Sequence, residues 1–258
     1  MKLAIVNSDQ RMQHVYFSLS QEYETLLINE FTNFDRIMHA DALILPVKGI
    51  TSTGSLYANG KELVLPSSFW DGFKNKEVFA GIPQAFLKQN FPQCHYYMQD
   101  EQLKQRNATY TAEGILFLMI DNTSRCLQEQ LVDVIGYGTC GKEIVRWLQA
   151  LHIPTRIIRR VCDQQDHCLS VEQYRQTRCG DIIINTSISQ VMDHDLLCSW
   201  EKKPLIIDIA TPDVIDYTTA LQRGIRVIKA GNLPTMVAYE SAGRTIADYI
   251  RGKLHGKR

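Results

Sequence analysis

Residues 131–151, LVDVIGYGTCGKEIVRWLQAL, decide the fold of this chain. An apolar run ends at Ile135, Gly136, Gly138 and Gly141 follow at G-x-G-x-x-G spacing, and apolar residues then recur at helical intervals. The pattern predicts a strand, a tight turn and a helix. The first glycine of such a turn lets the chain bend sharply, the second lets backbone approach a diphosphate, and the third lets helix and strand pack closely.

The sequence around the glycine motif decides whether the motif indicates a dinucleotide site. A lone motif of this kind is weak evidence, because glycine-rich turns are common. Here a strand precedes it, a helix follows it, and further strand–helix units continue downstream, so we predict a dinucleotide site at a helix start. Cys140 stands where a thiol can become reactive, but we favour a small filler residue. The candidate residues of the turn are Gly136, Tyr137, Gly138, Thr139, Cys140 and Gly141.

The end of the second predicted strand, residues 155–159, indicates which nucleotide is bound. NAD-binding domains usually carry an acid about 20 residues past the motif, which binds the ribose 2′-hydroxyl. This chain has Arg159 and Arg160 there. Two guanidiniums suit a 2′-phosphate through charge-assisted, forked hydrogen bonds. We therefore expect NADP as the cofactor and keep NAD as the alternative; a merely solvated strand end is the structural alternative.

Composition excludes several other classes of protein. The chain has 258 residues, which suits one large or two small domains, and its 28 basic and 28 acidic residues give no net charge. Lysine and arginine are scattered, so we expect no nucleic-acid partner. No run of 18 apolar residues exists and the N-terminus turns polar too soon for a signal peptide, so we expect a soluble, cytoplasmic protein without a membrane partner.

The cysteines predict neither a disulfide framework nor a metal site. Seven cysteines without framework spacing favour reduced thiols. Cys162 and Cys168, with His167 between them, could form a metal corner. Nothing elsewhere completes a tetrahedral set, so we expect a loop without metal.

Strands and helices alternate along the rest of the chain, which predicts an α/β fold of two α/β domains joined by a connector helix. In the first domain, strands are expected at residues 2–6, 23–28, 42–46, 62–65, 77–80 and 95–98 of a parallel sheet. Thr111 is expected to cap the connector helix. The predicted parts are a flavodoxin-like α/β substrate domain (1–110), the connector (111–130), a Rossmann-type doubly wound parallel sheet (131–236), and a C-terminal helix packing back on the first domain (237–258).

Later strands of the Rossmann-type sheet are expected at residues 181–185, 205–209 and 225–229. Ligands of open α/β sheets bind at the carboxyl ends of strands. We therefore expect Asn185, Thr186, Ala210 and Thr211 to contact the cofactor. For Asn185 the alternative is a side chain that satisfies loop backbone.

Several stretches along the chain are characteristic in combination: SDQR at 8–11, LPV at 45–47, FAGI at 79–82, TAEG at 111–114, IGYG at 135–138, INT at 184–186 and LP at 233–234. In order and content they resemble the dipicolinate synthase family of endospore-forming bacteria, specifically its Rossmann-type A subunit, over nearly the whole chain. The resemblance implies an NADP-linked oxidation of dihydrodipicolinate, or a similar small cyclic dicarboxylate, to the aromatic form. It also implies a separate flavoprotein-like second subunit. Arg160 matches a basic position of that family, and we expect a homo-oligomer.

The chain departs from the family pattern at three rim loops and is shorter than typical members. Ser187-Ile188 replaces a proline that follows Asn-Thr, TPDV at 211–214 lacks a Pro-Gly-Gly turn, and NLPT at 232–235 replaces Gly-Leu-Pro-Gly. These loops follow strands, where cofactor and substrate meet, so a changed substrate fits the pattern. The alternatives are a cofactor-binding regulatory or scaffold subunit without catalysis, and a 2-hydroxyacid dehydrogenase-like enzyme. The last strand is not followed by an obvious catalytic His-Glu pair.

A dicarboxylate needs cations to orient it, and Arg11, Lys48 and Lys229 are the candidates. Glu113 and His14 are the candidates for proton removal, although each also suits a structural or surface role. The loop at residues 46–54 is a candidate substrate wall, with a plain flexible turn as its alternative.

Overall fold

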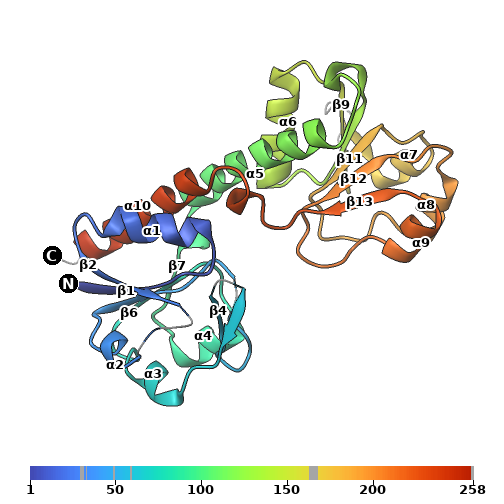
Figure 1. Cartoon of the computed structure of the whole chain (residues 1–258). Coiled ribbons are helices and arrows are strands. Elements are labelled where there is room, and N and C mark those ends of the chain that lie inside the picture. The colour runs from blue at the N-terminus through green and yellow to red at the C-terminus, as the bar shows by residue number, and fades with distance from the viewer. Residues whose placement is uncertain (30–31, 33, 49, 59, 163–167, 257–258) are drawn as a thin grey trace. The chain divides into compact units, whose positions relative to one another are not determined.

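The computed structural model describes residues 1–258 except 30–31, 33, 49, 59, 163–167 and 257–258. The chain divides into two compact units, Met1–Asn107 with Ala238–Arg258, and Ala108–Val237. Each unit is built on its own parallel sheet (Figure 1), so the predicted α/β fold class is confirmed. Within the described residues, no helix is both long and apolar enough to cross a membrane.

The first unit contains a five-stranded parallel sheet in the order β2-β1-β3-β6-β7. Counted along the chain, these strands have the 2-1-3-4-5 order of flavodoxin-like sheets. The strands are β1 (Lys2–Val6), β2 (Glu24–Ile28), β3 (Ala42–Ile44), β6 (Glu77–Ala80) and β7 (His95–Tyr96).

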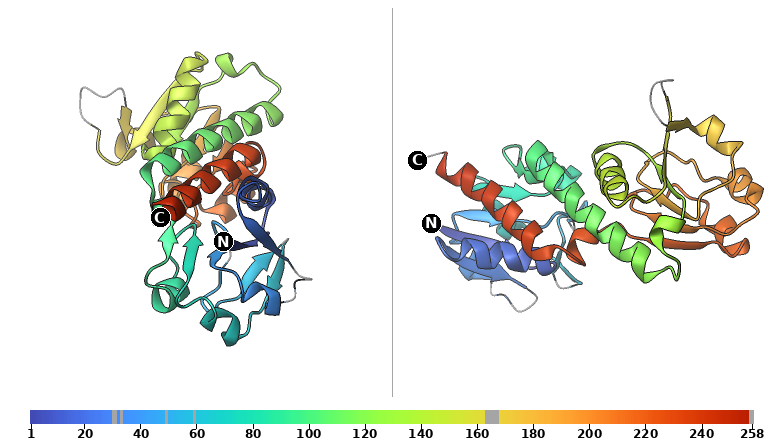
Figure 2. Two further views of the ribbon diagram at one scale, coloured as in Figure 1. Left: turned by 90° about the vertical axis from the view of Figure 1, so that its left-hand side faces the viewer. Right: turned by 90° about the horizontal axis from the view of Figure 1, so that it is seen from above.

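Both faces of this sheet are covered by helices, because alternate side chains of a strand point to opposite faces. Leu3 and Ile5 of β1 pack toward α1 (Gln10–Leu19) and α10 (Tyr239–His255), which lie side by side in Figures 1 and 2. Gly243 allows this close packing, since a Cβ there would lie 2.6 Å from the carbonyl oxygen of Arg11. The opposite face packs on α2 (Phe34–Ile37), α3 (Ser67–Asp71) and α4 (Ala85–Asn90).

A β-hairpin in the first unit replaces one predicted strand of the parallel sheet. β4 (Leu56–Ala58) and β5 (Lys61–Leu63) pair antiparallel and form a separate two-stranded sheet. The expectation that residues 62–65 continue the parallel sheet is wrong. The connection from Ala58 to Lys61 is too short for the crossover that parallel neighbours require.

The second unit contains six parallel strands in the order β10-β9-β8-β11-β12-β13. This is the 3-2-1-4-5-6 order of a doubly wound sheet, and it places the topological switch between β8 and β11. The short strand β10 was not predicted. The strands are β8 (Val132–Ile135), β9 (Thr155–Arg159), β10 (Cys168–Ser170), β11 (Ile182–Asn185), β12 (Leu205–Asp208) and β13 (Arg226–Lys229).

Alternating isoleucines divide the core of the second unit into two layers. Ile182 and Ile184 of β11 pack with α6 (Thr139–Ala150) and with the later turns of α5 (Glu101–Asp121), whereas Ile183 packs on the other face. That face is covered by α7 (Val171–Arg175), α8 (His194–Ser199) and α9 (Tyr217–Gln222). Short 3-10 turns complete the chain: η1 (Tyr97–Gln99), η2 (Leu127–Glu129) and η3 (Leu233–Thr235).

The connector helix α5 begins at Glu101, ten residues before the predicted start at Thr111. Asp100 Oδ1 accepts a hydrogen bond from the backbone N–H of Leu103 at 2.9 Å, which is the contact an N-cap makes. Thr111 is buried inside the helix, so its predicted capping role is wrong. Most of the polar residues before it, such as Glu101, Gln102 and Lys104, are good helix formers, but they give no apolar signal of their own.

Glu143 joins α6 to α5 within the second unit. Its side chain is 5% exposed, and Oε1 accepts hydrogen bonds from Thr109 Oγ1 at 2.8 Å, Arg146 Nη2 at 2.6 Å and Trp147 Nε1 at 3.1 Å. The hydrogen bond from Arg146 outweighs the effect of burial and, with those from Thr109 and Trp147, lowers the pKa of Glu143 to about 2. The carboxylate therefore stays charged where the two helices meet.

Glu143→Ala should destabilise the chain. It takes this acceptor away from the Thr109 and Trp147 donors, and we expect the free energy of unfolding to fall by about 2 kcal/mol near neutral pH. Urea titration of the full chain, followed by circular dichroism, measures this change. Glu129→Ala is the matched control, because Glu129 is exposed and its carboxylate bonds to no described residue.

The same pair of proteins tests the pKa of Glu143. Its folded value of about 2 lies below the roughly 4.3 of an unfolded glutamate. The stabilisation is therefore complete above the unfolded value and is lost as pH falls toward the folded one. The stability difference between wild type and Glu143→Ala should shrink over that interval, and a difference that stays constant would contradict the assignment.

Candidate functional site

A cavity of about 490 Å³ opens at the topological switch of the second unit. It lies at the carboxyl ends of the strands, where β8 and β11 send their following loops in opposite directions. Four segments line it: residues 135–138, 158–160, 171–172 and 186–191. Of the predicted cofactor residues, it brings together Gly136, Tyr137, Gly138, Arg159, Arg160 and Thr186.

The glycine turn forms one side of the cavity. Gly136 has φ +95°, and a Cβ there would lie 2.5 Å from Thr186 Oγ1. A Cβ on Gly141 would lie 2.3 Å from the carbonyl oxygen of Gly136. Around Gly138, by contrast, no described atom outside Gly138 and its neighbours in the chain lies within 4 Å of the Cβ position. The turn is therefore packed tightly on the protein side and bare at Gly138.

The bare backbone leads directly into α6. Gly138 occupies the N-cap position, so the helix start has no side-chain cap, and no described side chain bonds to its first N–H groups. Such a helix start offers N–H donors and the positive end of the helix dipole to an anion. Thr139 and Cys140 are the first residues of the helix, and burial raises the pKa of the Cys140 thiol. This agrees with the filler interpretation of Cys140.

Two guanidiniums, those of Arg159 and Arg160, also line the cavity. The guanidinium carbon of Arg159 lies 5.9 Å from the centre of the Tyr137 ring. Arg160 is exposed, and its Nη2 donates to Ser189 Oγ at 3.0 Å; it forms no ion pair with any described residue. A pair of forked donors beside a bare helix start suits a nucleotide that carries a further phosphate.

Sequence reasoning placed Ser187 and Ile188 on the rim where cofactor and substrate meet but did not name them as cofactor residues, and it missed residues 189–191 and the start of α7. Ile188 lines the cavity with a 75% exposed side chain, which offers apolar surface to a flat ring. Ser187, Ser189 and Glu172 line the cavity as well. Ser187 and Ser189 could have been found from their place directly after Asn185 and Thr186, and Glu172 from its place after the helix cap Ser170. Which of these side chains face the cavity depends on the fold.

Asn185 serves the loop backbone, which is the alternative considered for it. Its side chain is 1% exposed, Oδ1 accepts from the N–H of Ser187 at 3.2 Å, and Nδ2 donates to Asp208 Oδ1 at 2.8 Å. Ala210 and Thr211 follow β12 at the same edge of the sheet. The predicted cofactor residues that do not line the cavity are Thr139, Cys140, Gly141, Asn185, Ala210 and Thr211.

Asp208 holds together this edge of the sheet. It also forms an ion pair with Lys229, one of the cations predicted to orient the substrate. It accepts hydrogen bonds from Lys229 Nζ at 2.8 Å and Tyr217 Oη at 2.6 Å. Burial alone would raise the pKa of Asp208, but these bonds and the one from Asn185 outweigh it and lower the pKa. Lys229 also pairs with Asp213 at 3.1 Å, so two carboxylates already engage it.

The other catalytic candidates do not line the cavity. Arg11 has a side chain only 5% exposed and pairs with Asp9 at 3.0 Å, so it anchors the start of α1. His14 packs on the ring of Tyr239 at 5.4 Å. Lys48 is exposed and Glu113 half-buried. The candidate substrate loop at 46–54 includes Gly49, which lies outside the described residues.

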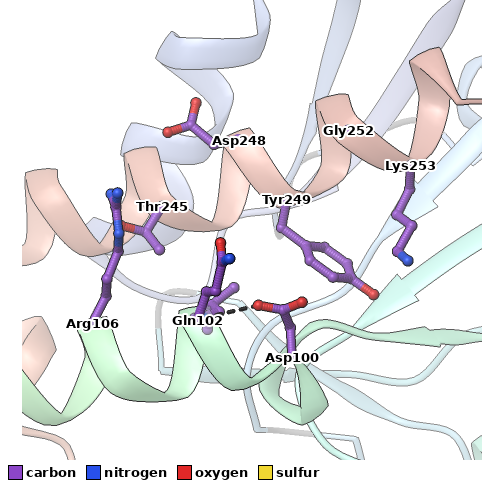
Figure 3. Close-up of a pocket in the computed structure, with 9 residues that line it drawn as sticks. Asp100, Gln102, Arg106, Thr245, Asp248, Tyr249, Gly252 and Lys253 are labelled. Carbon is purple, nitrogen blue, oxygen red and sulfur yellow. Dashed lines mark hydrogen bonds between the residues drawn. The ribbon is translucent and has the colours of Figure 1, made fainter.

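A groove of about 350 Å³ in the first unit lies between the start of α5 and α10 (Figure 3). Its walls carry Asp100 and Asp248 as well as Arg106 and Lys253. Charges of both signs favour no one class of ionic ligand. Asp100 is already engaged in capping α5 through Leu103.

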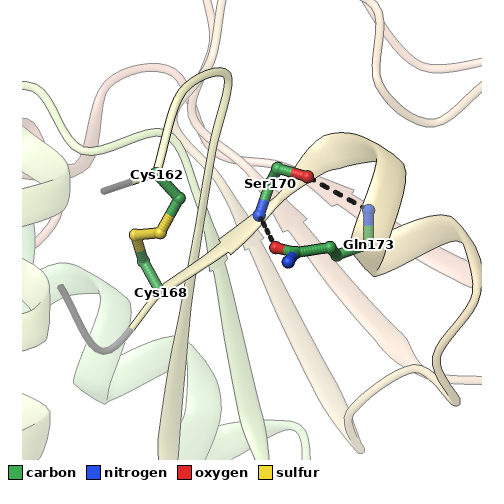
Figure 4. The surroundings of a disulfide bond; sticks show 4 residues. All are labelled: Cys162, Cys168, Ser170 and Gln173. Carbon is green, nitrogen blue, oxygen red and sulfur yellow. Dashed lines mark hydrogen bonds between the residues drawn. A yellow bond between two sulfur atoms is a disulfide. The ribbon is translucent and has the colours of Figure 1, made fainter. Parts of the chain in front are cut away.

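The expectation of reduced thiols is wrong for one cysteine pair. Cys162 and Cys168 form a disulfide with a Cα–Cα distance of 6.0 Å (Figure 4). Pairing of β10 with β9 places Cys168 opposite Ile157, and the chain leaving β9 carries Cys162 close to it. His167 lies outside the described residues, among which no group of three or more metal-ligating side chains occurs. The free thiols are those of Cys94, Cys126, Cys140, Cys179 and Cys198.

Comparison with known proteins agrees with the fold and with the resemblance. No protein-family model matches the chain. The A subunit of dipicolinate synthase from Bacillus subtilis (strain 168) is 24% identical over 97% of this chain and 94% of its own length. The crystal structure of the dipicolinate synthase A subunit from Bacillus halodurans has a TM-score of 0.86 at 23% identity, and the match covers 98% of this chain and 97% of that one.

A second kind of neighbour places the fold among dehydrogenases. The NADPH-dependent glyoxylate/hydroxypyruvate reductase of Sinorhizobium meliloti has a TM-score of 0.59 at 15% identity, over 98% of this chain and 93% of that one. The chain thus has the fold of nicotinamide-dependent oxidoreductases. In both sequence and fold it is similar over nearly its whole length to the A subunit of dipicolinate synthase, which confirms the family resemblance inferred from its sequence.

Proposed function

We propose that this chain binds NADP in the cavity at the switch between β8 and β11 and acts as an oxidoreductase. The observation that carries the proposal is the cavity itself, which combines a bare backbone at Gly138, an uncapped helix start and the guanidiniums of Arg159 and Arg160. Helix starts of this kind bind diphosphates, and forked guanidiniums suit the 2′-phosphate.

The cavity residues fit distinct parts of the nucleotide. The first N–H groups of α6 hold the diphosphate against the turn at residues 136–139. Arg159 and Arg160 hold the 2′-phosphate, and the exposed face of Ile188 packs against the adenine ring. The bound nicotinamide supplies hydride chemistry, while the protein supplies binding and orientation.

We further propose dihydrodipicolinate, or a similar small cyclic dicarboxylate, as the substrate. Aromatisation removes a hydride from a ring carbon together with a proton, and NADP⁺, when bound, would accept the hydride. Similarity over nearly the whole length to the A subunit of dipicolinate synthase supports this assignment. We also propose that a flavoprotein-like second subunit takes part and that the chain forms a homo-oligomer.

A cofactor-binding subunit without catalysis is the second candidate. The observation that favours it is that Arg11 and Lys229, two of the three cations predicted to orient a dicarboxylate, are each paired with carboxylates. A dicarboxylate would have to displace those partners or use other cations.

Turnover of the full chain separates the two candidates. The absorbance of reduced nicotinamide is followed with NADP and dihydrodipicolinate, alone and with the flavoprotein-like subunit of a relative. We expect NADPH to accumulate. Absence of turnover under both conditions removes this substrate, and tight NADP binding without activity on a panel of cyclic dicarboxylates favours the second candidate.

Two glycine variants test the cavity independently of turnover. Gly138→Ala adds a methyl group that meets no described atom of the chain, so we expect unfolding to change by less than about 0.5 kcal/mol. The methyl group would occupy space assigned to the diphosphate, so NADP affinity should fall at least about tenfold, by the cost of overpacking. Thermal unfolding and isothermal titration calorimetry measure the two effects.

Gly141→Ala is the matched comparison, because its methyl group would overlap the carbonyl oxygen of Gly136. We expect it to destabilise the chain by about 1 to 3 kcal/mol. If Gly138→Ala bound NADP as tightly as the wild type, the proposed position of the diphosphate would be wrong.

A further inference from the structure

A continuous run of hydrogen bonds leads from the core of the sheet to the cavity. Asp208 is fully buried and accepts from Asn185 Nδ2 at 2.8 Å. Asn185 Oδ1 accepts from the N–H of Ser187 at 3.2 Å, and Ser187 Oγ accepts from the N–H of Ser189 at 3.1 Å. The buried carboxylate of Asp208 thus holds the loop after β11 through Asn185, which bonds to both Asp208 and Ser187.

The last bond of this run ends on a guanidinium. Ser189 Oγ accepts from Arg160 Nη2 at 3.0 Å, although the two residues come from separate loops. Arg160 forms no ion pair with any described residue, and this is the hydrogen bond that the structure shows for its side chain. An exposed arginine without such a contact samples many rotamers, and ordering it opposes ligand binding.

Arg159 is held in a different way. Its guanidinium lies over the ring of Tyr137, on the side of the glycine turn. Among the described residues, Ser189 bonds to Arg160 and Ser187 but not to Arg159. The two arginines therefore have separate supports, and a change at Ser189 should affect one of them and leave the other in place.

We propose that Ser189 is a positioning residue that holds Arg160 toward the nucleotide cavity and so sets the preference for NADP over NAD. This inference rests on the proposed function, because it assigns the 2′-phosphate to Arg160. The hydroxyl of Ser189 keeps the guanidinium beside the cavity before the nucleotide arrives. Preorganisation of this kind improves affinity by reducing the entropy lost on binding.

Binding of four nucleotides to the full chain tests the inference by isothermal titration calorimetry. The probes are NADP, NAD, 2′,5′-ADP and 5′-AMP, which form two pairs that differ in the 2′-phosphate. For Ser189→Ala we expect about a fivefold loss of affinity for NADP and 2′,5′-ADP, the typical effect of one hydrogen bond. Affinity for NAD and 5′-AMP should not change, and Ser189→Thr, which keeps the hydroxyl, should restore the preference.

Double variants identify the partner of Ser189. In an Arg160→Ala background, Ser189→Ala should have no further effect on NADP affinity, because the group it positions is gone. In an Arg159→Ala background it should still cost about fivefold. Ser199→Ala is the matched control, since its hydroxyl donates to the backbone of Leu196 away from the cavity and should not alter the preference.

The outcomes separate failure of the inference from failure of the proposed function. If the wild type binds neither NADP nor NAD, the proposed function falls and the inference with it. If the wild type prefers NADP but Ser189→Ala leaves the preference unchanged, weakens both nucleotides equally, or adds fully to Arg160→Ala, the positioning role of Ser189 is overturned. Unchanged thermal unfolding of Ser189→Ala excludes general loss of structure as the cause.

Discussion

The ionised carboxylate of Asp208 is the constraint on which the carboxyl-end edge of the sheet in the second unit depends. A buried charge is unfavourable unless hydrogen bonds replace the water it has lost. Asp208 obtains them from Asn185 on the neighbouring strand, from Tyr217 on α9 and from Lys229 on the other neighbouring strand. The same carboxylate also accepts from the N–H of Ala210 at 3.0 Å. Satisfying one charge therefore ties together the carboxyl ends of β11, β12 and β13.

A second buried carboxylate, that of Asp133 on β8, has a similar structural role without lining the cavity. Arg156 donates to it in forked geometry at 2.7 and 2.9 Å, Tyr174 Oη donates at 2.9 Å, and the N–H of Gly180 donates at 2.6 Å. These contacts connect β8 with β9, α7 and the start of β11. The two acids show how a sheet with an apolar interior also uses fully paired charges to set the positions of its neighbours.

The cavity combines a widely shared frame with loops particular to this chain. The glycine turn and the strand order belong to many nicotinamide-dependent enzymes, and a shared fold does not by itself define a substrate. The loop after β11 is more distinctive. Ser187 donates its N–H to Asn185, a contact that a proline at this position, expected from the family resemblance, would lack. The altered rim therefore has its own hydrogen bonding.

Local patterns explain why some parts could be predicted from the sequence. The glycine spacing depends on neighbours in the chain and on general rules of turn geometry, so residues 131–151 were sufficient to place a strand, a turn and a helix. Likewise, Asp9 and Ser170 cap the helices that follow them through contacts three residues away. The α/β class follows from the alternation of such local signals.

Contacts between distant segments could not be predicted from the sequence and are defined only by the tertiary structure. The sequence alone determined the fold class, the glycine turn and the two arginines after the second strand. The fold decided that Lys229 is paired with carboxylates, that Cys162 reaches Cys168, and that Ser189 meets Arg160. The physical reason is that charge pairing and side-chain hydrogen bonds depend on which loops meet at a sheet edge. That meeting depends on strand order, which short-range patterns do not encode.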